Sequence, residues 1–148
     1  MRSVEMHLQY IFTEILKNAF RATCEHHVNA LDLPPIQAHI ALEGDTLVVK
    51  IKDQGGGIRP EDLDKIWIYG FTTATAPPRD YRESGPYSMQ QNAGAGEQDS
   101  PLAGQGFGLK LSRIYCQYFG AGSLTVESKY GEGTEVVIRL CQGQTQEH

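Results

Sequence analysis

The 148-residue chain lacks the features that mark membrane proteins and general nucleic-acid binders. No apolar run approaches the roughly 20 residues that span a bilayer, and the first residues lack the charged segment and apolar core of a signal peptide. Basic residues number 13 against 18 acidic ones, so the chain exerts no broad attraction on nucleic acid or on an anionic membrane. We expect neither as a partner, and any polyanion must be bound locally.

Cysteine is also scarce. Cys24, Cys116 and Cys141 are odd in number and widely spaced, which argues against a disulfide framework or a zinc site. We expect buried thiols in a reducing compartment. His26 and His27 would point about 100° apart on a helix, and no cluster completes a metal shell around them, so we expect solvated histidines at a helix end.

Two common phosphate-binding motifs are missing as well. The chain has no GxxxxGK[ST] loop. Its glycines near residue 106 follow a GxGxG spacing and do not come after a strand within a βαβ unit. These absences disfavour a P-loop enzyme and a dinucleotide-binding fold.

Apolar periodicity predicts one α/β domain. The expected elements, in order, are a helix over about 6–30, strands over 36–42 and 47–51, a short helix near 60–67, a helix over 108–119, and strands over 123–128 and 134–140. Packing the helices on the hairpins gives a two-layer α/β sandwich with a mixed, mostly antiparallel sheet.

The stretch from about 72 to 103 is rich in Pro, Gly, Ser, Gln and Asn and has few large aliphatic residues. A loop of that length is either disordered or functional, and its place between two glycine-rich segments favours a lid over a site. The catalytic domain is then expected to span 1–141, with a polar tail over 142–148.

The first candidate segment lies on the first expected helix. Glu14 and Asn18 are four residues apart and project from one side, away from the apolar stripe. An Asn amide oxygen suits Mg²⁺, and a carboxylate one turn away could accept a proton from an attacking hydroxyl. Lys17 and Arg21 could reach phosphate oxygens, although for Lys17 a solvated basic face is an equal alternative.

The second segment is the run Asp53-Gln54-Gly55-Gly56-Gly57, directly after an expected strand. Asp53 can accept a hydrogen bond from an exocyclic amine such as that of adenine, while Gly55 and Gly57 leave the backbone bare for close approach. A plain Asp turn is the alternative, but three glycines exceed what a turn requires.

The third segment is Gly104, Gln105, Gly106, Phe107, Gly108 and Leu109. Alternating glycines before a helix expose backbone amides at a helix N-terminus, an arrangement that attracts phosphate. The three segments together suggest a nucleotide site.

In this order, with a lid between the second and third, the segments resemble the ATP-binding fold shared by histidine kinases, Hsp90-type chaperones, gyrase-type topoisomerases and MutL proteins. Within it, the segments 14–23, 53–58, 71–74 and 104–109, together with 112–115 and 118–120, are most similar to mitochondrial 2-oxoacid dehydrogenase kinases. The likeness covers about residues 7–140.

The resemblance implies a protein serine/threonine kinase that uses ATP and Mg²⁺. It makes Glu14 the general base, Asn18 the Mg²⁺ ligand, Lys17 and Arg21 phosphate contacts, and Asp53 the reader of adenine.

Further site residues follow from the resemblance alone. Thr72 and Thr73 match a pair that lines the nucleotide where the lid begins, and Thr134 matches a threonine near the base. Some relatives also bind K⁺ through backbone oxygens of the segment that corresponds to 66–71. One departure stands out: Lys110 replaces the proline that usually follows Gly-x-Gly-Leu, which changes the local charge without removing the amides.

The implied substrate is the E1 component of a pyruvate or branched-chain dehydrogenase complex in the mitochondrial matrix. The family's N-terminal helical bundle, which helps to engage the E2 lipoyl domain, lies outside the likeness, so this chain is expected to correspond to the catalytic half alone. Relatives form homodimers through this domain. The alternatives are the ATP-binding domain of a bacterial-type sensor histidine kinase and a non-catalytic ATP-sensing module.

Overall fold

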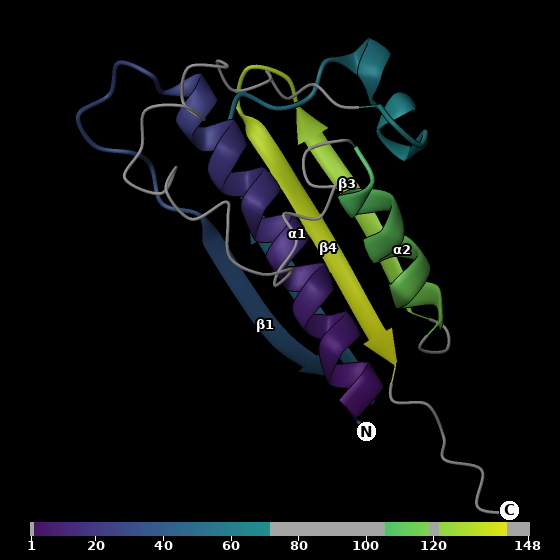
Figure 1. Cartoon of the computed structure of the whole chain (residues 1–148). Coiled ribbons are helices and arrows are strands. Elements are labelled where there is room, and N and C mark those ends of the chain that lie inside the picture. Colours follow the sequence, from purple (N-terminus) through teal and green to yellow (C-terminus); the bar gives the residue numbers. More distant parts are fainter. Residues whose placement is uncertain (1, 72–105, 119–121, 142–148) are drawn as a thin grey trace, which may run out of the picture.

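The structure, a computed structural model, describes residues 2–71, 106–118 and 122–141. Two helices cover one face of a four-stranded sheet, which confirms the two-layer α/β sandwich (Figure 1). The helices are α1 (Arg2–His26) and α2 (Gly108–Tyr118), and the strands are β1 (Gln37–Glu43), β2 (Thr46–Lys52), β3 (Ser123–Lys129) and β4 (Gly133–Cys141). The strand order is β1-β2-β4-β3, and each of these pairs is antiparallel.

Helix α1 places its apolar stripe against the sheet as its three-and-four spacing predicts. Ile11, Ile15 and Ala19 are at most 3% exposed and belong to the central hydrophobic cluster. The helix ends at His26, earlier than expected, and His27 Nε2 lies 2.8 Å from the carbonyl oxygen of Gln54. His27 is thus half-buried against the second glycine-rich segment, whereas His26 is exposed.

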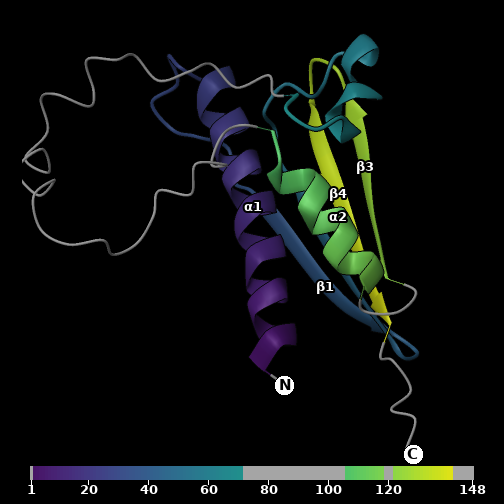
Figure 2. The same ribbon diagram turned by 45° about the vertical axis from the view of Figure 1, so that its right-hand side comes forward.

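The two hairpins meet through their inner strands, β2 and β4. Val49 pairs with Ile138, and both are buried beneath the helices. Leu124 and Val126 of β3 face the same side, as the alternation predicts. Figure 2 shows α1 and α2 side by side over this sheet. The hydrophobic core therefore fills the space between one sheet face and two helices.

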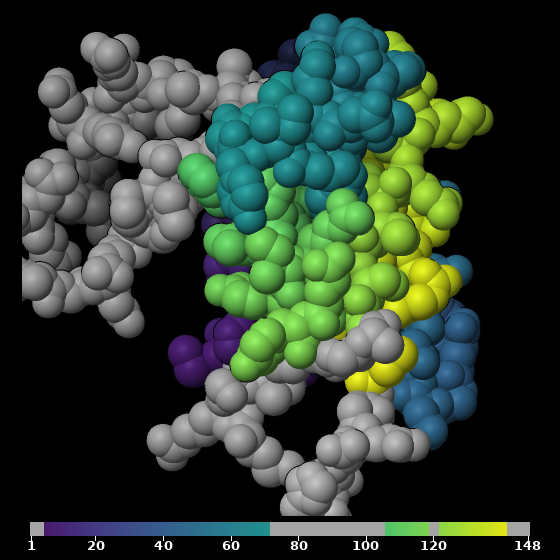
Figure 3. All heavy atoms as spheres, turned by 90° about the vertical axis from the view of Figure 1, so that its right-hand side faces the viewer, coloured from purple at the N-terminus to yellow at the C-terminus, as the bar shows by residue number. Residues whose placement is uncertain are grey.

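The short helix expected near 60–67 consists of two 3₁₀ turns, η1 (Pro60–Asp62) and η2 (Lys65–Trp67). η2 packs on α2, where the guanidinium of Arg113 lies 4.4 Å from the centre of the Trp67 ring. In Figure 3 the segment that carries both turns sits above α2 on the same face of the molecule. These turns bring the chain to one end of the cavity described below.

The expectation of three buried thiols is wrong for Cys24. Cys116 is buried and Cys141 is half-buried, but Cys24 is exposed. The core face of α1 continues through Thr23, whose neighbour Cys24 points about 100° away from it. Burial raises the pKa of the Cys116 thiol to about 11, so that thiol stays protonated.

In the part of the chain that the structure describes, neither helix combines the length and apolarity needed to cross a membrane. No group of three or more His, Cys, Asp or Glu side chains gathers there in a way that could hold a metal ion.

Candidate nucleotide site

A cavity of about 370 Å³ lies between α1, the sheet and the start of α2. Its volume falls within the range of small-molecule sites. The predicted site residues that line it are Glu14, Lys17, Asn18, Arg21, Asp53, Gly106, Gly108, Leu109 and Thr134. Residues from all three glycine- or carboxylate-bearing segments thus meet at one cavity, although Glu14 and Leu109 are 95 positions apart in sequence.

The α1 wall carries four of these residues in two bonded pairs. Lys17 Nζ donates to Glu14 Oε1 at 3.0 Å, and Arg21 donates to Asn18 Oδ1 at 3.3 Å. Glu14 is largely covered, with 18% of its side chain exposed, while Lys17 is half exposed. The wall therefore offers one carboxylate, one amide oxygen and two cations to the cavity.

The Glu14 carboxylate rests against the first residue of α2. A Cβ added to Gly108 would collide with Glu14 Oε2, so a side chain there would push the carboxylate out of its present position. The N-terminus of a helix favours a negative charge. Nearby, burial and then the charge of Glu14 raise the pKa of Tyr10 to about 12. Glu14 is thus positioned by Lys17 on one side and by α2 on the other.

Asp53 forms a fixed acceptor at the opposite wall. It is 6% exposed, and its Oδ1 accepts hydrogen bonds from the backbone N–H groups of Gly55 at 2.8 Å and Thr134 at 3.3 Å. Burial raises the pKa of Asp53, and these two bonds oppose that rise. Both bonds use Oδ1, which leaves Oδ2 to accept from a ligand.

Thr134 is held from both sides. Its carbonyl oxygen accepts from the Asp53 N–H at 2.9 Å, and its hydroxyl lies 3.0 Å from Ser128 Oγ. Ser128 Oγ in turn accepts the N–H of Ile58 at 2.7 Å. This network fastens the glycine-rich segment to the β3–β4 hairpin.

Gly55 and Gly57 are among the predicted site residues that do not line the cavity. A Cβ on Gly55 would lie 2.5 Å from the Cβ of Ala22, and one on Gly57, at φ +68°, would collide with the carbonyl oxygen of Lys129. These glycines let α1 and the β3–β4 turn approach the segment closely. Phe107 also lies off the cavity, with its ring 5.9 Å from that of Tyr69. The predicted site residues Thr72, Thr73, Gly104 and Gln105 lie outside the described residues.

The third wall joins the two chain segments on either side of 72–105. Gly106 adopts φ +77°, and a Cβ there would collide with the backbone of Phe71. Lys110 is 4% exposed, and its Nζ donates to the carbonyl oxygen of Gly106 and, at 3.5 Å, to that of Phe71. Burial lowers the pKa of Lys110. The sequence identifies Lys110 only as a substitution for proline. Its contact with Phe71, 39 positions earlier, is visible only in the structure.

An apolar lining was not predicted from the sequence as part of the site. Outside the two helices it comprises Ile51, Ile58, Ile66, Phe71, Val126 and Val136. The inward alternation of β3 signalled Val126, but the others depend on how separate elements meet. Such a lining suits the flat faces of an aromatic ring system.

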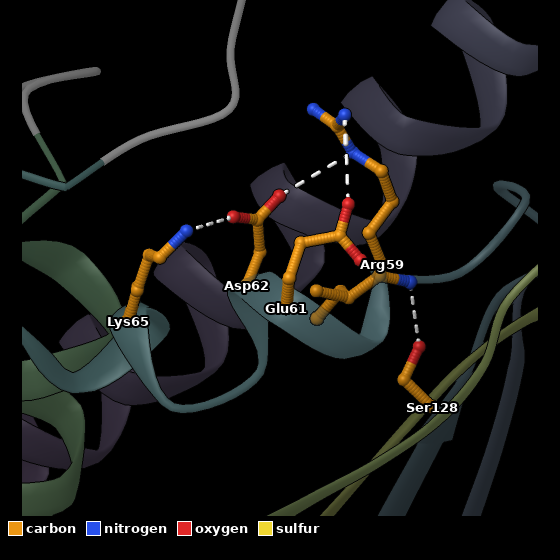
Figure 4. Close-up of polar contacts among 6 residues, drawn as sticks. Arg59, Glu61, Asp62, Lys65 and Ser128 are labelled. Carbon is orange, nitrogen blue, oxygen red and sulfur yellow. Dashed lines mark hydrogen bonds and ion pairs between the residues drawn. The ribbon is translucent and has the colours of Figure 1, made fainter.

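Charged residues hold the turn that supplies Ile66. Lys65 Nζ donates to Asp62 Oδ1 at 2.8 Å, and Arg59 Nε lies 3.4 Å from Asp62 Oδ2 (Figure 4). The bond from Lys65 is the main reason that the pKa of Asp62 lies below its ordinary value. The cluster fixes η1 relative to η2.

The sequence of this chain matches a known family profile and several curated proteins. The profile of a family described as "Histidine kinase-, DNA gyrase B-, and HSP90-like ATPase" matches residues 3–144. Human "[Pyruvate dehydrogenase (acetyl-transferring)] kinase isozyme 1, mitochondrial" is 39% identical over 137 residues, which cover 93% of this chain and 28% of the human protein.

Two further relatives give the same result. The mitochondrial pyruvate dehydrogenase kinase of Ascaris suum is 40% identical over 93% of this chain and 30% of its own length. That of Schizosaccharomyces pombe is 40% identical over 96% of this chain and 32% of its own length. The chain therefore spans about a third of the length of these curated relatives.

Proposed function

Because this chain belongs to the histidine kinase-, DNA gyrase B- and HSP90-like ATPase family, we propose that its cavity binds ATP with Mg²⁺ and forms the catalytic domain of a protein serine/threonine kinase. One observation carries most of the weight: buried Asp53 faces the same cavity as Glu14 and Asn18. A fixed acceptor on one wall and oxygen ligands with cations on the other match the two ends of a nucleotide.

The adenine would lie at the Asp53 end. Its exocyclic amine would donate to Asp53 Oδ2, near Thr134, and its ring would pack on the apolar lining. Gly55 and Gly57 would act by letting Asp53 and the hairpin come together, and not by touching the ring. Thr72 and Thr73 remain predicted contacts at this end.

The phosphates would lie between α1 and the start of α2. Lys17 and Arg21 line this part of the cavity and would supply cations, and the backbone amides of the 104–109 segment would supply donors. Asn18 Oδ1 would hold Mg²⁺, and its bond to Arg21 is 3.3 Å long. One neutral oxygen fits an ion that takes its other ligands from phosphate and water, and bound Mg²⁺ would neutralise charge on the phosphates.

Glu14 would act as the general base. A serine hydroxyl would attack the γ-phosphorus in line, the bond from that phosphorus to the bridging oxygen would break, and the hydroxyl proton would pass to the Glu14 carboxylate. Lys17 holds that carboxylate at 3.0 Å, and α2 limits its movement. Most of the rate enhancement would come from positioning and charge.

We propose the E1 component of a pyruvate dehydrogenase complex, in the mitochondrial matrix, as the substrate. The support is the names of the relatives, which are mitochondrial pyruvate dehydrogenase kinases. Contact with the E2 lipoyl domain and homodimer formation are further predictions from the resemblance. The resemblance also predicts K⁺ on backbone oxygens of 66–71, and the salt series for Lys110 decides between that ion and the Lys110 ammonium, which contacts the Phe71 carbonyl.

The first test is calorimetric titration with ATP and Mg²⁺. Wild-type chain is expected to bind at micromolar levels, and Asp53→Ala is expected to lose at least about tenfold in affinity because the fixed acceptor is gone. Asp45→Ala removes an exposed carboxylate in the β1–β2 turn, outside the cavity lining, and serves as the control. No binding by folded wild-type chain would refute the proposed nucleotide site.

A second test separates binding from catalysis. Glu14→Gln should leave ATP affinity within a few fold but reduce phosphate transfer to E1 by about 10²-fold or more, since the amide cannot accept the proton. Transfer at the wild-type rate would exclude Glu14 as the base. Acid treatment of the product distinguishes acid-stable phosphoserine from the acid-labile phosphohistidine of a sensor kinase, and ATP binding without transfer would favour a sensing module.

A further inference from the structure

Lys110 is a buried cation without a carboxylate partner among the described residues. It lies in the first turn of α2, where the helix dipole disfavours positive charge. Lys17 and Arg21 line the same cavity. Burial and the helix dipole both disfavour a charged Lys110. We therefore expect the ammonium charge to be compensated by a specific contact.

The contacts of Lys110 identify that use. Its Nζ donates to the carbonyl oxygens of Phe71 and Gly106, which flank the segment 72–105. The two backbones touch there, because a Cβ on Gly106 would collide with Phe71. Two carbonyl oxygens turned toward one point repel each other unless a hydrogen-bond donor or a cation lies between them, and an ammonium is both.

Resting on the proposed function, we propose that the Lys110 ammonium is a built-in monovalent cation. It holds the Phe71 and Gly106 carbonyls together at the edge of the nucleotide cavity, so that ATP binding does not require a dissolved monovalent ion. An ammonium has three N–H donors and the two carbonyls take two of them. The third is then available to an anionic oxygen in the cavity, such as one of a phosphate.

This assignment makes Lys110 a positioning residue. K⁺ also binds backbone carbonyl oxygens, and Phe71 belongs to the segment where the resemblance predicts a K⁺ ion. In this chain the Phe71 carbonyl already has an ammonium beside it. The chain should therefore be insensitive to K⁺, and removing the lysine side chain should make it sensitive.

The test measures ATP affinity in potassium, ammonium, sodium and choline chloride at equal ionic strength. Wild-type affinity should vary by less than about twofold across the four salts. Lys110→Ala, which leaves space for an ion, should lose about tenfold or more in choline and recover to within about threefold in ammonium or potassium chloride. Lys110→Met fills that space with an uncharged chain and should show the loss in every salt.

Lys129→Ala is the matched control, because Lys129 is exposed and pairs with Glu132 in the β3–β4 turn. It should bind ATP as the wild type does in all four salts. A wild-type affinity that rises more than about fivefold from choline to potassium would overturn the proposal. So would wild-type affinity of either Lys110 variant in choline, or a loss in Lys110→Ala that no salt restores.

Thermal unfolding without nucleotide separates this proposal from the proposed function. Lys110→Ala should have a lower Tm than wild type in choline, with recovery in ammonium or potassium chloride that Lys110→Met does not show. If the Tm of Lys110→Ala recovers in ammonium or potassium chloride while the wild-type chain does not bind ATP, the built-in cation is supported and the nucleotide site is refuted. If Lys110→Ala does not fold, the wild-type salt series and Lys110→Met decide the question.

Discussion

The segments 53–57 and 106–108 are both rich in glycine and border one cavity, but they are held differently. The first lies between α1 and the β3–β4 hairpin, and Gly56 both donates to Glu132 and accepts from Gly131. The second is held mainly by Phe71 and by the side chains of Lys110 and Glu14. Sheet and helix fix one side of the cavity, and a few side chains fix the other.

The glycines of both segments allow other parts of the protein to pack against the backbone. In both segments a Cβ would first meet protein atoms: Ala22 at Gly55, Lys129 at Gly57, Phe71 at Gly106 and Glu14 at Gly108. The bare backbone is therefore needed for the protein to close around the site, whether or not a ligand is bound. In the first segment this closure should govern global stability, and in the second it should govern binding.

Gly57→Ala should have the largest effect on stability. Alanine would be strained at φ +68° and would also collide with a backbone carbonyl, so the free energy of unfolding should fall by about 4 kcal/mol. Gly131→Ala has a similar φ of +88° but open space, and should cost about 1 kcal/mol. Urea unfolding measures both, and equal losses would mean that the collision is relieved without cost.

Gly106→Ala should lower the free energy of unfolding less than Gly57→Ala does, but it should also lower the affinity for ATP. Its φ of +77° matches the +80° of Gly70, which has open space, so the pair isolates the collision with Phe71. We expect Gly106→Ala to lose about 2 kcal/mol of stability and about tenfold in ATP affinity, against about 1 kcal/mol and no affinity change for Gly70→Ala. Calorimetry and urea unfolding check this, and unchanged affinity in Gly106→Ala would remove the distinction between the segments.

The smallest effects concern pH. The folded pKa of Asp53 is raised, so its contribution to stability is full below the ordinary value of 3.8 and is lost as pH rises through the folded pKa. The folded pKa of Asp62 is lowered, so its contribution is full above 3.8 and is lost as pH falls through the folded pKa. The destabilisation by Asp53→Asn should grow on acidification and that by Asp62→Asn should shrink, as urea unfolding between about pH 6 and about pH 3 would show. Parallel pH profiles would contradict both assignments.

Local pattern was sufficient to predict most of the fold. The spacing of Ile11, Ile15 and Ala19 predicts the buried face of α1, and Gly44 and Gly131 predict the turns of the two hairpins. The meeting of Glu14, Asn18 and Asp53 at one cavity was also predicted, because each segment had its own chemical signature.

Other features depend on distances that no local pattern contains. Two hairpins can dock in more than one order, and only packing places β4 between β2 and β3. Lys110 contacts a carbonyl 39 residues earlier, and Gly55 is shaped by Ala22 on a separate helix. The exposure of Cys24 depends on where the core face of α1 lies, which a cysteine count does not determine.

The strand order also has a consequence for the timing of synthesis. Thr46 of β2 pairs with Cys141 of β4, 95 residues later. Synthesis of those residues takes roughly 5 to 20 s, so β2 cannot pair with β4 until that time after it is made. The entropy of closing a loop grows only with the logarithm of its length, and adding ten residues to the loop closed by the contact of Phe71 with Gly106 costs about 0.2 kcal/mol. The sheet can therefore accept wide variation in the length of that segment at almost no thermodynamic cost.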